Sequence, residues 1–298
     1  MRKITNKITK FVKTHKPIIL LAVVLVAVVA FWAPADATST AKTTLASVTA
    51  AENQTYTSDG RLFVTGNNGI FEIVPGTNSK VTVVERAPKQ SCGFGGIVQA
   101  LGTIYVNCTA NGTSYLYAAT ASATPTFKRI YTMKGTILAN GLTADSSGRL
   151  YVASTFLNRI LRLTPSASDP LTIARSEVWL NGAGTFTNGI KYANGVIYWT
   201  DSMFVRHATI NADGSHGKAK TIFSALTYFD DMAVDNNGIL VADYLGGKIR
   251  KYDLNGRATG SVSGLSGPSS VARARAPFPA GSLIVTERGA NRVSLVTP

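Results

Sequence analysis

Cysteine and histidine are scarce in this sequence, which has two cysteines and three histidines among 298 residues. A thiolate metal site would need further ligands near the cysteines, and a catalytic thiol would need a histidine partner. Beyond the N-terminal segment, the only histidines are His207 and His216, for which we predict surface or packing roles. The sequence therefore gives no support for cysteine or histidine chemistry.

Several catalytic motifs are also missing. The sequence contains no G-x-S-x-G elbow, no P-loop, no H-E-x-x-H and no G-x-G-x-x-G between a strand and a helix. Serine hydrolases, zinc proteases and nucleotide enzymes are disfavoured for this reason. No stretch after the N-terminal segment has helical periodicity, so we expect an all-β domain.

The first 37 residues have the three parts of a secretory signal. Six lysines and arginines precede a charge-free run over residues 17–33, and Ala35-Asp36-Ala37 follows as an A-x-A cleavage site. We predict cleavage after Ala37; the alternative is an uncleaved anchor at the short limit for spanning a bilayer. In either case the domain over residues 38–298 is expected to be secreted or extracytoplasmic, and only an uncleaved segment would contact the membrane.

The net charge is strongly positive. Removing residues 1–37 takes away six positive charges and one negative charge, so the formal +14 becomes +9. Such a balance favours anionic surfaces or ligands. No dense basic run with interleaved aromatic residues is present, so nucleic acid is not an expected partner.

A short strand that begins at a turn glycine is repeated six times along the chain. The steps between successive glycines are 42, 46, 47, 43 and 43 residues, and the glycines are Gly60, Gly102, Gly148, Gly195, Gly238 and Gly281. A period in the forties with several short strands per unit is typical of a β-propeller. We predict six blades of four strands; in the third repeat the strands are expected at 140–144, 149–154, 159–164 and 176–180.

The last repeat is too short to supply its own outer strand, because the chain stops soon after a third strand over residues 292–296. The segment Thr43–Val48 is compatible with a β-strand and precedes the first inner strand. We predict that it completes the sixth blade, which closes the ring and removes an open sheet edge.

The two cysteines, Cys92 and Cys108, both fall in the second repeat, one at the start of a predicted strand and one at the end of the next. Outside the cytoplasm a structural disulfide is the expected state of such a pair. Two reduced thiols are the alternative.

Four of the six repeats place an oxygen-bearing side chain at one level of the predicted central channel. Seven or eight residues before the turn glycine stand Glu52, Asn140, Asn188 and Asp230. Hard oxygen donors from several strands suit Ca²⁺, with Zn²⁺, Mn²⁺ or Mg²⁺ as alternatives. The competing interpretation is that Asn140-Gly141 and Asn188-Gly189 are ordinary turn dipeptides.

The repeats resemble the senescence-marker-protein/gluconolactonase (regucalcin-like) family of six-bladed propellers. The stretch from Phe229 to Asp243 is similar to that family's P-D-G-[ML]-x-x-D-x-x-G-x-L-W-V-A motif, and Thr187–Ile190 with Tyr198–Ser202 is similar to its N-G-[LI] … LYxxDS blade. The resemblance implies a divalent cation held by Glu52, Asn188 and Asp230. It also implies that Asn140 contacts the cation indirectly or binds substrate, and that Asp230 doubles as the catalytic base.

The departures from the family pattern concern the substrate. The R-x-N-D-G segment of sugar-lactone members is absent, since Thr136-Ile-Leu precedes Ala139-Asn140, and Asp231 replaces the glycine of P-D-G. These departures give no support for an aldonolactone substrate. Aromatic residues expected at the mouth would make the pocket more apolar than a sugar site, so we expect a hydrophobic lactone or ester; they are Phe94, Phe156, Phe229 and Tyr244. The carboxylate of Asp230 or Asp231 would activate a water molecule, which would attack a substrate carbonyl polarised by the metal.

Loops that join second to third strands are expected to supply the substrate-binding residues at the same mouth. The candidates are Phe156, Asp201, Tyr244 and Arg288, with Arg288 suited to a substrate carboxylate or phosphate. Two other functions stay open: a non-catalytic binding propeller of the NHL type, and a strictosidine-synthase-like enzyme in which Glu287 would be essential.

Overall fold

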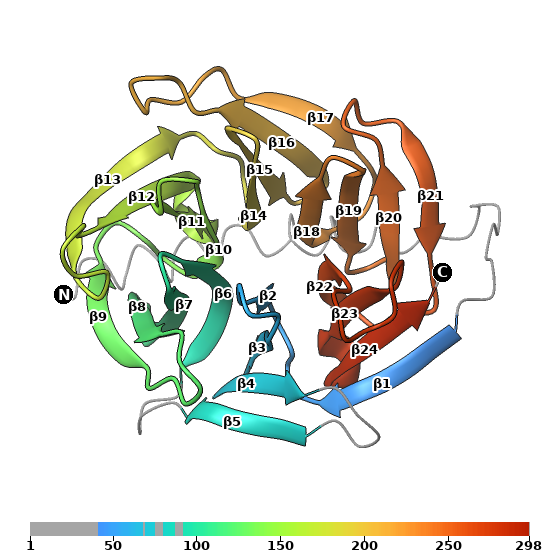
Figure 1. The fold of residues 1–298 in the computed structure, drawn as a ribbon. Coiled ribbons are helices and arrows are strands. Elements are labelled where there is room, and N and C mark those ends of the chain that lie inside the picture. The colour runs from blue at the N-terminus through green and yellow to red at the C-terminus, as the bar shows by residue number, and fades with distance from the viewer. Residues whose placement is uncertain (1–40, 68, 75–79, 87–91, 298) are drawn as a thin grey trace. The chain divides into compact units, whose positions relative to one another are not determined.

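The computed structural model describes residues 41–67, 69–74, 80–86 and 92–297, without the side chains of 80–86. The predicted signal segment, residues 1–37, lies outside this range. Within the described residues the strands form six four-stranded antiparallel sheets arranged as blades around an axis (Figure 1). The prediction of an all-β, six-bladed propeller is confirmed.

The strands of each blade are ordered from the axis outward. Blade 1 consists of β2 (Gln54–Tyr56), β3 (Leu62–Gly66), β4 (Gly69–Val74) and β5 (Lys80–Arg86). Blade 2 consists of β6 (Gly93–Ala100), β7 (Thr103–Ala110), β8 (Thr113–Thr120) and β9 (Lys128–Met133). Blade 3 consists of β10 (Ala139–Ala144), β11 (Leu150–Ser154), β12 (Arg159–Pro165) and β13 (Ile173–Asn181).

The second half of the ring follows the same order. Blade 4 consists of β14 (Thr187–Ala193), β15 (Val196–Asp201), β16 (Phe204–Thr209) and β17 (Lys220–Ser224). Blade 5 consists of β18 (Phe229–Asp235), β19 (Gly238–Asp243), β20 (Lys248–Tyr252) and β21 (Ala258–Val262). Blade 6 consists of β22 (Pro268–Arg273), β23 (Leu283–Glu287), β24 (Arg292–Thr297) and β1 (Ala41–Ser47).

Two single-turn 3₁₀ helices, η1 (Thr155–Leu157) and η2 (Arg288–Ala290), follow the second strands of blades 3 and 6. Among the described residues, no helix is long and apolar enough to cross a membrane.

The turn glycines that mark the repeats are needed for their backbone conformation. All six have positive φ, between +69° at Gly102 and +117° at Gly238. A residue with a side chain is disfavoured in this backbone conformation. Each glycine stands just before a second strand or, like Gly238, begins it. These strands pack between neighbouring blades, and β11 and β23 are buried at every position. Burial on both faces explains why these strands read as continuous apolar runs rather than as an alternation.

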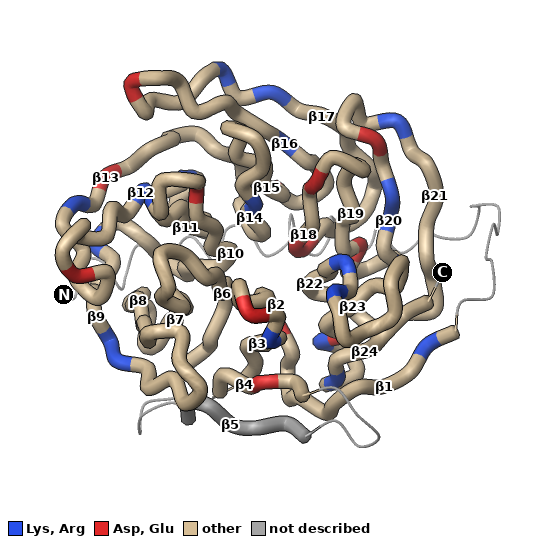
Figure 2. Tube along the Cα trace, in the orientation of Figure 1, with Lys and Arg blue, Asp and Glu red and all other residues tan. Residues whose placement is uncertain are grey.

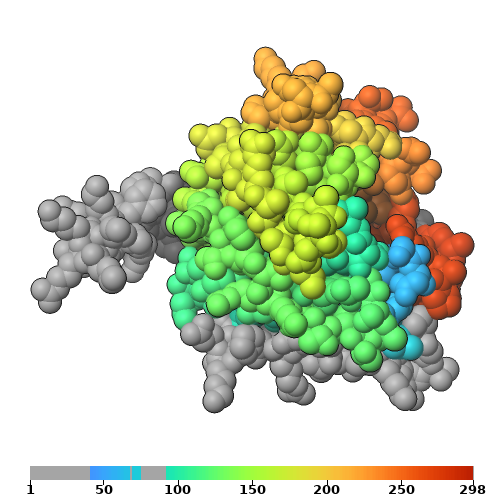
Figure 3. Space-filling view, turned by 60° about the vertical axis from the view of Figure 1, so that its left-hand side comes forward, coloured from blue at the N-terminus to red at the C-terminus, as the bar shows by residue number. Residues whose placement is uncertain are grey.

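The described residues form six hydrophobic clusters, one between each pair of neighbouring blades. Between blades 3 and 4, for example, Tyr151 and Trp179 pack with Trp199 and Ile190. Figure 3 shows the surfaces of blade 2 (green) and blade 3 (yellow-green) in contact along the side of the ring. Each blade therefore buries its faces against its neighbours, and an isolated blade would expose these apolar faces to water.

The N-terminal strand closes the ring as predicted. β1 pairs antiparallel with β24, from Ala41 opposite Thr297 to Ser47 opposite Arg292. Beyond the strand, the Val48 amide donates to the Asn291 carbonyl at 2.9 Å. The predicted disulfide is also present: Cys92 and Cys108 are bonded, buried, and 5.7 Å apart at their Cα atoms.

Candidate functional site

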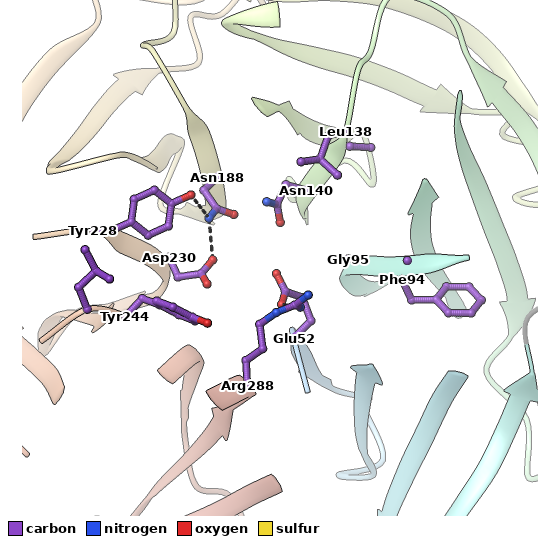
Figure 4. Close-up of a pocket in the computed structure, with 13 residues that line it drawn as sticks. Glu52, Phe94, Gly95, Leu138, Asn140, Asn188, Tyr228, Asp230, Tyr244 and Arg288 are labelled. Atoms are coloured by element: carbon purple, nitrogen blue, oxygen red, sulfur yellow. Dashed lines mark hydrogen bonds and ion pairs between the residues drawn. The ribbon is translucent and has the colours of Figure 1, made fainter. Parts of the chain in front are cut away.

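The four oxygen-bearing residues predicted for the channel meet at one pocket. Glu52 precedes β2, and Asn140, Asn188 and Asp230 stand at the start of the inner strands β10, β14 and β18. The pocket has a volume of about 500 Å³. Its lining also includes Phe94, Gly95, Leu138, Tyr228, Tyr244, Leu245 and Arg288 (Figure 4).

Local backbone irregularities aim these side chains at the axis. The pairing of the inner with the second strand shifts register between Ala139 and Leu142, and the same shift recurs between Thr187 and Ile190 and between Phe229 and Met232. A bulge of this kind bends the strand and redirects a side chain. The donors thus point into the channel instead of following the ordinary alternation of the strand.

The glycine after each asparagine has a packing reason. A Cβ at Gly141 would lie 2.5 Å from the Asn188 carbonyl oxygen, and a Cβ at Gly189 would lie 2.5 Å from Cα of Asp231. Both glycines lie inside strands, so the alternative interpretation of these dipeptides as turns is wrong. They allow neighbouring inner strands to approach closely at the axis.

Hydrogen bonds fix part of the donor set. Nδ2 of Asn188 donates to Oδ1 of Asp230 at 2.7 Å and to the Tyr228 hydroxyl at 3.1 Å (Figure 4). On the other side of the pocket, Nη1 of Arg288 donates to Oε2 of Glu52. Two blades are joined by each of these contacts.

One oxygen of each donor is left without a partner. Within the described part of the chain, no hydrogen bond reaches Oε1 of Glu52, Oδ2 of Asp230 or the side-chain oxygens of Asn140 and Asn188. Four oxygens from four blades therefore face the same space with acceptor capacity to spare. Such an arrangement can accept a cation or several hydrogen-bond donors of a ligand.

The electrostatics of the pocket favour a cation. Burial raises the pKa of Asp230 well above its ordinary value, and the negative charges of Glu52 and Asp231 raise it further. Burial also raises the pKa of Glu52, although Arg288 opposes this shift. The pKa of Tyr228 is raised to about 12 by burial and by Asp230. Negative charge is thus concentrated near the axis; Figure 2 shows acidic residues there at β2 and β18.

The chemistry of the donors decides which metal the site fits. Among the described residues, no group of three or more His, Cys, Asp or Glu is placed to hold a metal. A metal in the pocket would depend on two carboxylates and two amides, all of them oxygen donors. Such a set fits Ca²⁺, whereas nitrogen and sulfur ligands would favour zinc.

Asp231 is not part of the pocket, although we predicted it as a candidate base. Its buried carboxylate lies between the two neighbouring inner strands: Nζ of Lys191 on β14 lies 2.6 Å from Oδ2, and the Ser270 hydroxyl on β22 donates to the same oxygen at 2.8 Å. The register shift between Phe229 and Met232 turns Asp230 toward the pocket and leaves Asp231 against the neighbouring strands. The catalytic role expected for Asp231 is not supported by its position.

Asp201 and Glu287 are also placed away from the pocket, because both end second strands beneath loops. Asp201 accepts hydrogen bonds from the Thr185 amide at 2.6 Å and from Nε of Arg206 at 3.0 Å. Glu287 is fully buried and accepts from Nε of Arg292 at 2.8 Å. These carboxylates hold loops in place, which argues against Asp201 as a substrate ligand and Glu287 as a catalytic residue.

Two of the four predicted substrate-binding loop residues, Tyr244 and Arg288, line the pocket, whereas Phe156 does not. Phe156 lies exposed outside it and contacts Phe186 edge to face. Sequence analysis missed Leu138 and Tyr228. Each stands two positions before a donor, so the register that identified Asn140 and Asp230 could also have identified them.

Comparison with known proteins identifies the fold. No family model and no curated protein matches the sequence. Solved structures with the same fold include a luciferin-regenerating enzyme, at 17% identity and a TM-score of 0.68 over 87% of this chain and 96% of that one. A gluconolactonase from Xanthomonas campestris aligns at 13% identity and a TM-score of 0.66 over 87% and 89%.

A chain of a nidogen/laminin complex also shares the fold, at 15% identity and a TM-score of 0.60 over 76% and 85% of the two chains. The chain is therefore a propeller with the fold of the gluconolactonases, and this fold also occurs in a protein–protein complex. Function has to be argued from the pocket, because one fold supports many activities.

Proposed function

We propose that this protein is an exported hydrolase that opens a lactone or cleaves an ester with the help of a bound divalent cation, best Ca²⁺. The observation that carries the proposal is the convergence of four unpartnered oxygens, from Glu52, Asn140, Asn188 and Asp230, on one pocket. These four residues would hold the ion. The likeness in fold to a gluconolactonase is consistent with this reaction.

The bound cation would polarise the substrate carbonyl and stabilise negative charge on its oxygen. The carboxylate of Asp230 faces the pocket, where the hydrogen bond from Asn188 to Oδ1 orients it, and it would take a proton from the attacking water. The water oxygen forms a bond to the carbonyl carbon, the bond to the leaving oxygen breaks, and the proton passes from Asp230 to that oxygen. The products are a carboxylic acid and an alcohol, which remain in one molecule when the substrate is a lactone.

Neighbouring residues position these groups. Tyr228 accepts from Asn188, so the Tyr228 proton is free to donate into the pocket, and its raised pKa of about 12 keeps it protonated. Arg288 has further N–H groups beyond the one that contacts Glu52, and these suit a substrate oxygen. Tyr244 and Asn140 complete the lining on either side.

The disulfide supports the export part of the proposal, because structural disulfides persist in oxidising compartments. The alternative of a non-catalytic binding propeller predicts no turnover. It gives no reason for two carboxylates to be buried near the axis, where the charge of Glu52 raises the pKa of Asp230.

The test is hydrolysis by the purified protein of a panel of lactones and aryl esters, with and without EDTA. We expect hydrolysis that EDTA abolishes and Ca²⁺ restores, and a loss of at least about a hundredfold in kcat/KM for Asp230→Asn. Asp253→Asn is the matched control, because Asp253 is a partly exposed acid in a turn away from the pocket. Hydrolysis that survives both EDTA and Asp230→Asn would contradict the proposal, as would inactivity towards every member of the panel.

A further inference from the structure

The loops at the pocket mouth expose large apolar side chains. Ile137, Phe156, Phe186, Leu226 and Leu245 are between 42% and 72% exposed. They lie on the connections that lead into inner strands or out of second strands, which all open on the face that holds the pocket. Single exposed apolar residues are common on proteins, but five around one mouth need an explanation.

These side chains continue the apolar walls of the pocket. On one side, Ile137 adjoins the pocket residue Leu138, the Phe156 amide donates to the Ile137 carbonyl at 3.4 Å, and Phe156 contacts Phe186 with ring centres 6.2 Å apart. We call Ile137, Leu138, Phe156 and Phe186 the apolar rim. It extends from the pocket over blade 3 to the start of blade 4.

The mouth has the same character farther round the ring, over blade 5. Leu245 both lines the pocket and is exposed, and Tyr244 and Tyr228 contact each other with ring centres 6.5 Å apart. The charged pair of Glu52 and Arg288 lies on blades 1 and 6, away from the rim (Figure 4). The mouth is therefore polar at one end and apolar at the other.

The rim loops also lack charge. Residues 134–138, 155–158 and 182–186 contain a single charged residue, Lys134. Turns at the opposite mouth, such as Asp145–Arg149 and Asp253–Arg257, carry charges of both signs. A polyhydroxylated substrate would find few partners on the rim, whereas an apolar chain would be removed from water there.

We propose that the substrate is a lactone or ester with a linear apolar chain, whose carbonyl end lies among the four donors and whose chain lies on the apolar rim. This inference rests on the proposed hydrolase function and specifies its substrate class. Phe156 and Phe186 are then specificity-determining residues, because they extend the contact surface beyond the pocket. The pocket of about 500 Å³ holds the reacting group and the first part of the chain.

The experiment compares γ-butyrolactone with γ-decalactone for the wild type, the double variant Phe156→Ser/Phe186→Ser, and the control Leu254→Ser. Leu254 is also an exposed leucine, but it lies in the turn between β20 and β21 at the other mouth. For the wild type we expect kcat/KM to be at least about tenfold higher for the ten-carbon lactone. The double variant should lower this ratio about tenfold, and Leu254→Ser should leave it unchanged.

A binding measurement separates this inference from the proposed function. Calorimetric titration with decanoate and butanoate should show tighter binding of decanoate, by about tenfold, that the double variant removes. If no lactone is hydrolysed but this preference is found, the hydrolase proposal fails and the apolar ligand class stands. If hydrolysis occurs with no dependence on chain length, or the double variant keeps the preference, the inference is overturned and the hydrolase proposal stands.

Gel filtration of the same variants tests whether the apolar rim is instead covered by a second copy of the chain. A wild-type dimer that the double variant converts to a monomer, with an unchanged chain-length ratio, would show that the rim is an interface between copies. That result would also overturn the inference.

Discussion

At the scale of single residues, the site depends on glycines as much as on the donors they follow. Gly189 lies inside β14, where an added Cβ would lie 2.7 Å from the Asp230 carbonyl oxygen and 2.5 Å from Cα of Asp231. Because these neighbours are backbone atoms of a central strand, they cannot move aside cheaply. The spacing of the inner strands, and with it the distance between Asn188 and Asp230, requires glycine here.

We therefore expect Gly189→Ala to lower the free energy of unfolding by about 1–3 kcal/mol, as measured by urea titration. The control is Gly93→Ala on inner strand β6, where the nearest atom to an added Cβ is 3.6 Å away, an ordinary contact. Its effect should stay within about 0.5 kcal/mol. Equal losses for the two variants would show that the close approach at Gly189 does not matter.

The residue scale is also where sequence analysis reached its limit. Counting back from the turn glycines located Glu52, Asn140, Asn188 and Asp230, because their position depends on a repeated backbone register. The same count could not separate Asp230 from Asp231, since the bulge that decides which carboxylate faces the axis is a property of the paired strands. The partners of Asp231, Lys191 and Ser270, come from other blades and have no signal in the local sequence.

At the scale of strands and loops, a carboxylate at the end of the second strand recurs in blades 4, 5 and 6. Asp201, Asp243 and Glu287 each bond an arginine at the start or middle of the third strand. Each also accepts backbone amides of a loop, such as Ser266 in the case of Glu287, at 2.7 Å. These carboxylates fix the loops that surround the pocket. Asp201 was predicted to bind substrate because an acidic residue near the mouth can do so, but its carboxylate is used to hold a loop.

The Glu287 contact predicts a pH dependence. Burial alone would raise the pKa of Glu287, but Arg292, Ser294 and the Ser266 amide outweigh burial and hold it below the ordinary 4.5. The folded state therefore binds the proton less readily than the unfolded state. The stabilisation is present above pH 4.5 and is lost as the pH falls through the lowered pKa of the folded protein.

Glu287→Gln should accordingly lower the free energy of unfolding at pH 7 by about 2 kcal/mol, and the difference from wild type should shrink below pH 4.5. Urea titrations at pH 7 and at pH 3.5 measure both values. Asp253→Asn, which affects a pair at 3.9 Å with an exposed arginine, should change little at either pH. A Glu287→Gln penalty that is as large at pH 3.5 as at pH 7 would contradict this assignment.

The strands themselves were predictable because turn glycines and apolar runs are local signals. In the third repeat, the predicted inner strand at 140–144 corresponds to β10 (Ala139–Ala144), and the predicted third strand at 159–164 to β12 (Arg159–Pro165). The outer strand, predicted at 176–180, is longer, since β13 spans Ile173–Asn181. Its exposed residues carry little apolar pattern, so hydrogen bonding to β12 rather than composition sets its length.

At the scale of the whole domain, the ring brings together residues that are far apart in the chain. Glu52 and Arg288 are 236 residues apart and belong to blades 1 and 6, which the strand β1 holds together through its pairing with β24. The site exists only when all six blades have closed, because its four donors come from blades 1, 3, 4 and 5. An ion held by all four would therefore link the blades across the axis and stabilise the folded ring.

The most direct measurement of the central claim is calorimetric titration of the metal-free protein with Ca²⁺, with the melting temperature followed at the same concentrations. We expect one ion to bind per chain and the melting temperature to rise as the site fills. Asp230→Asn should weaken binding by at least about tenfold, because it removes one of two carboxylate charges, whereas Asp253→Asn should bind as the wild type does. A wild-type protein that binds no Ca²⁺ or other divalent cation, or that binds it equally well with Asp230→Asn, would contradict the account.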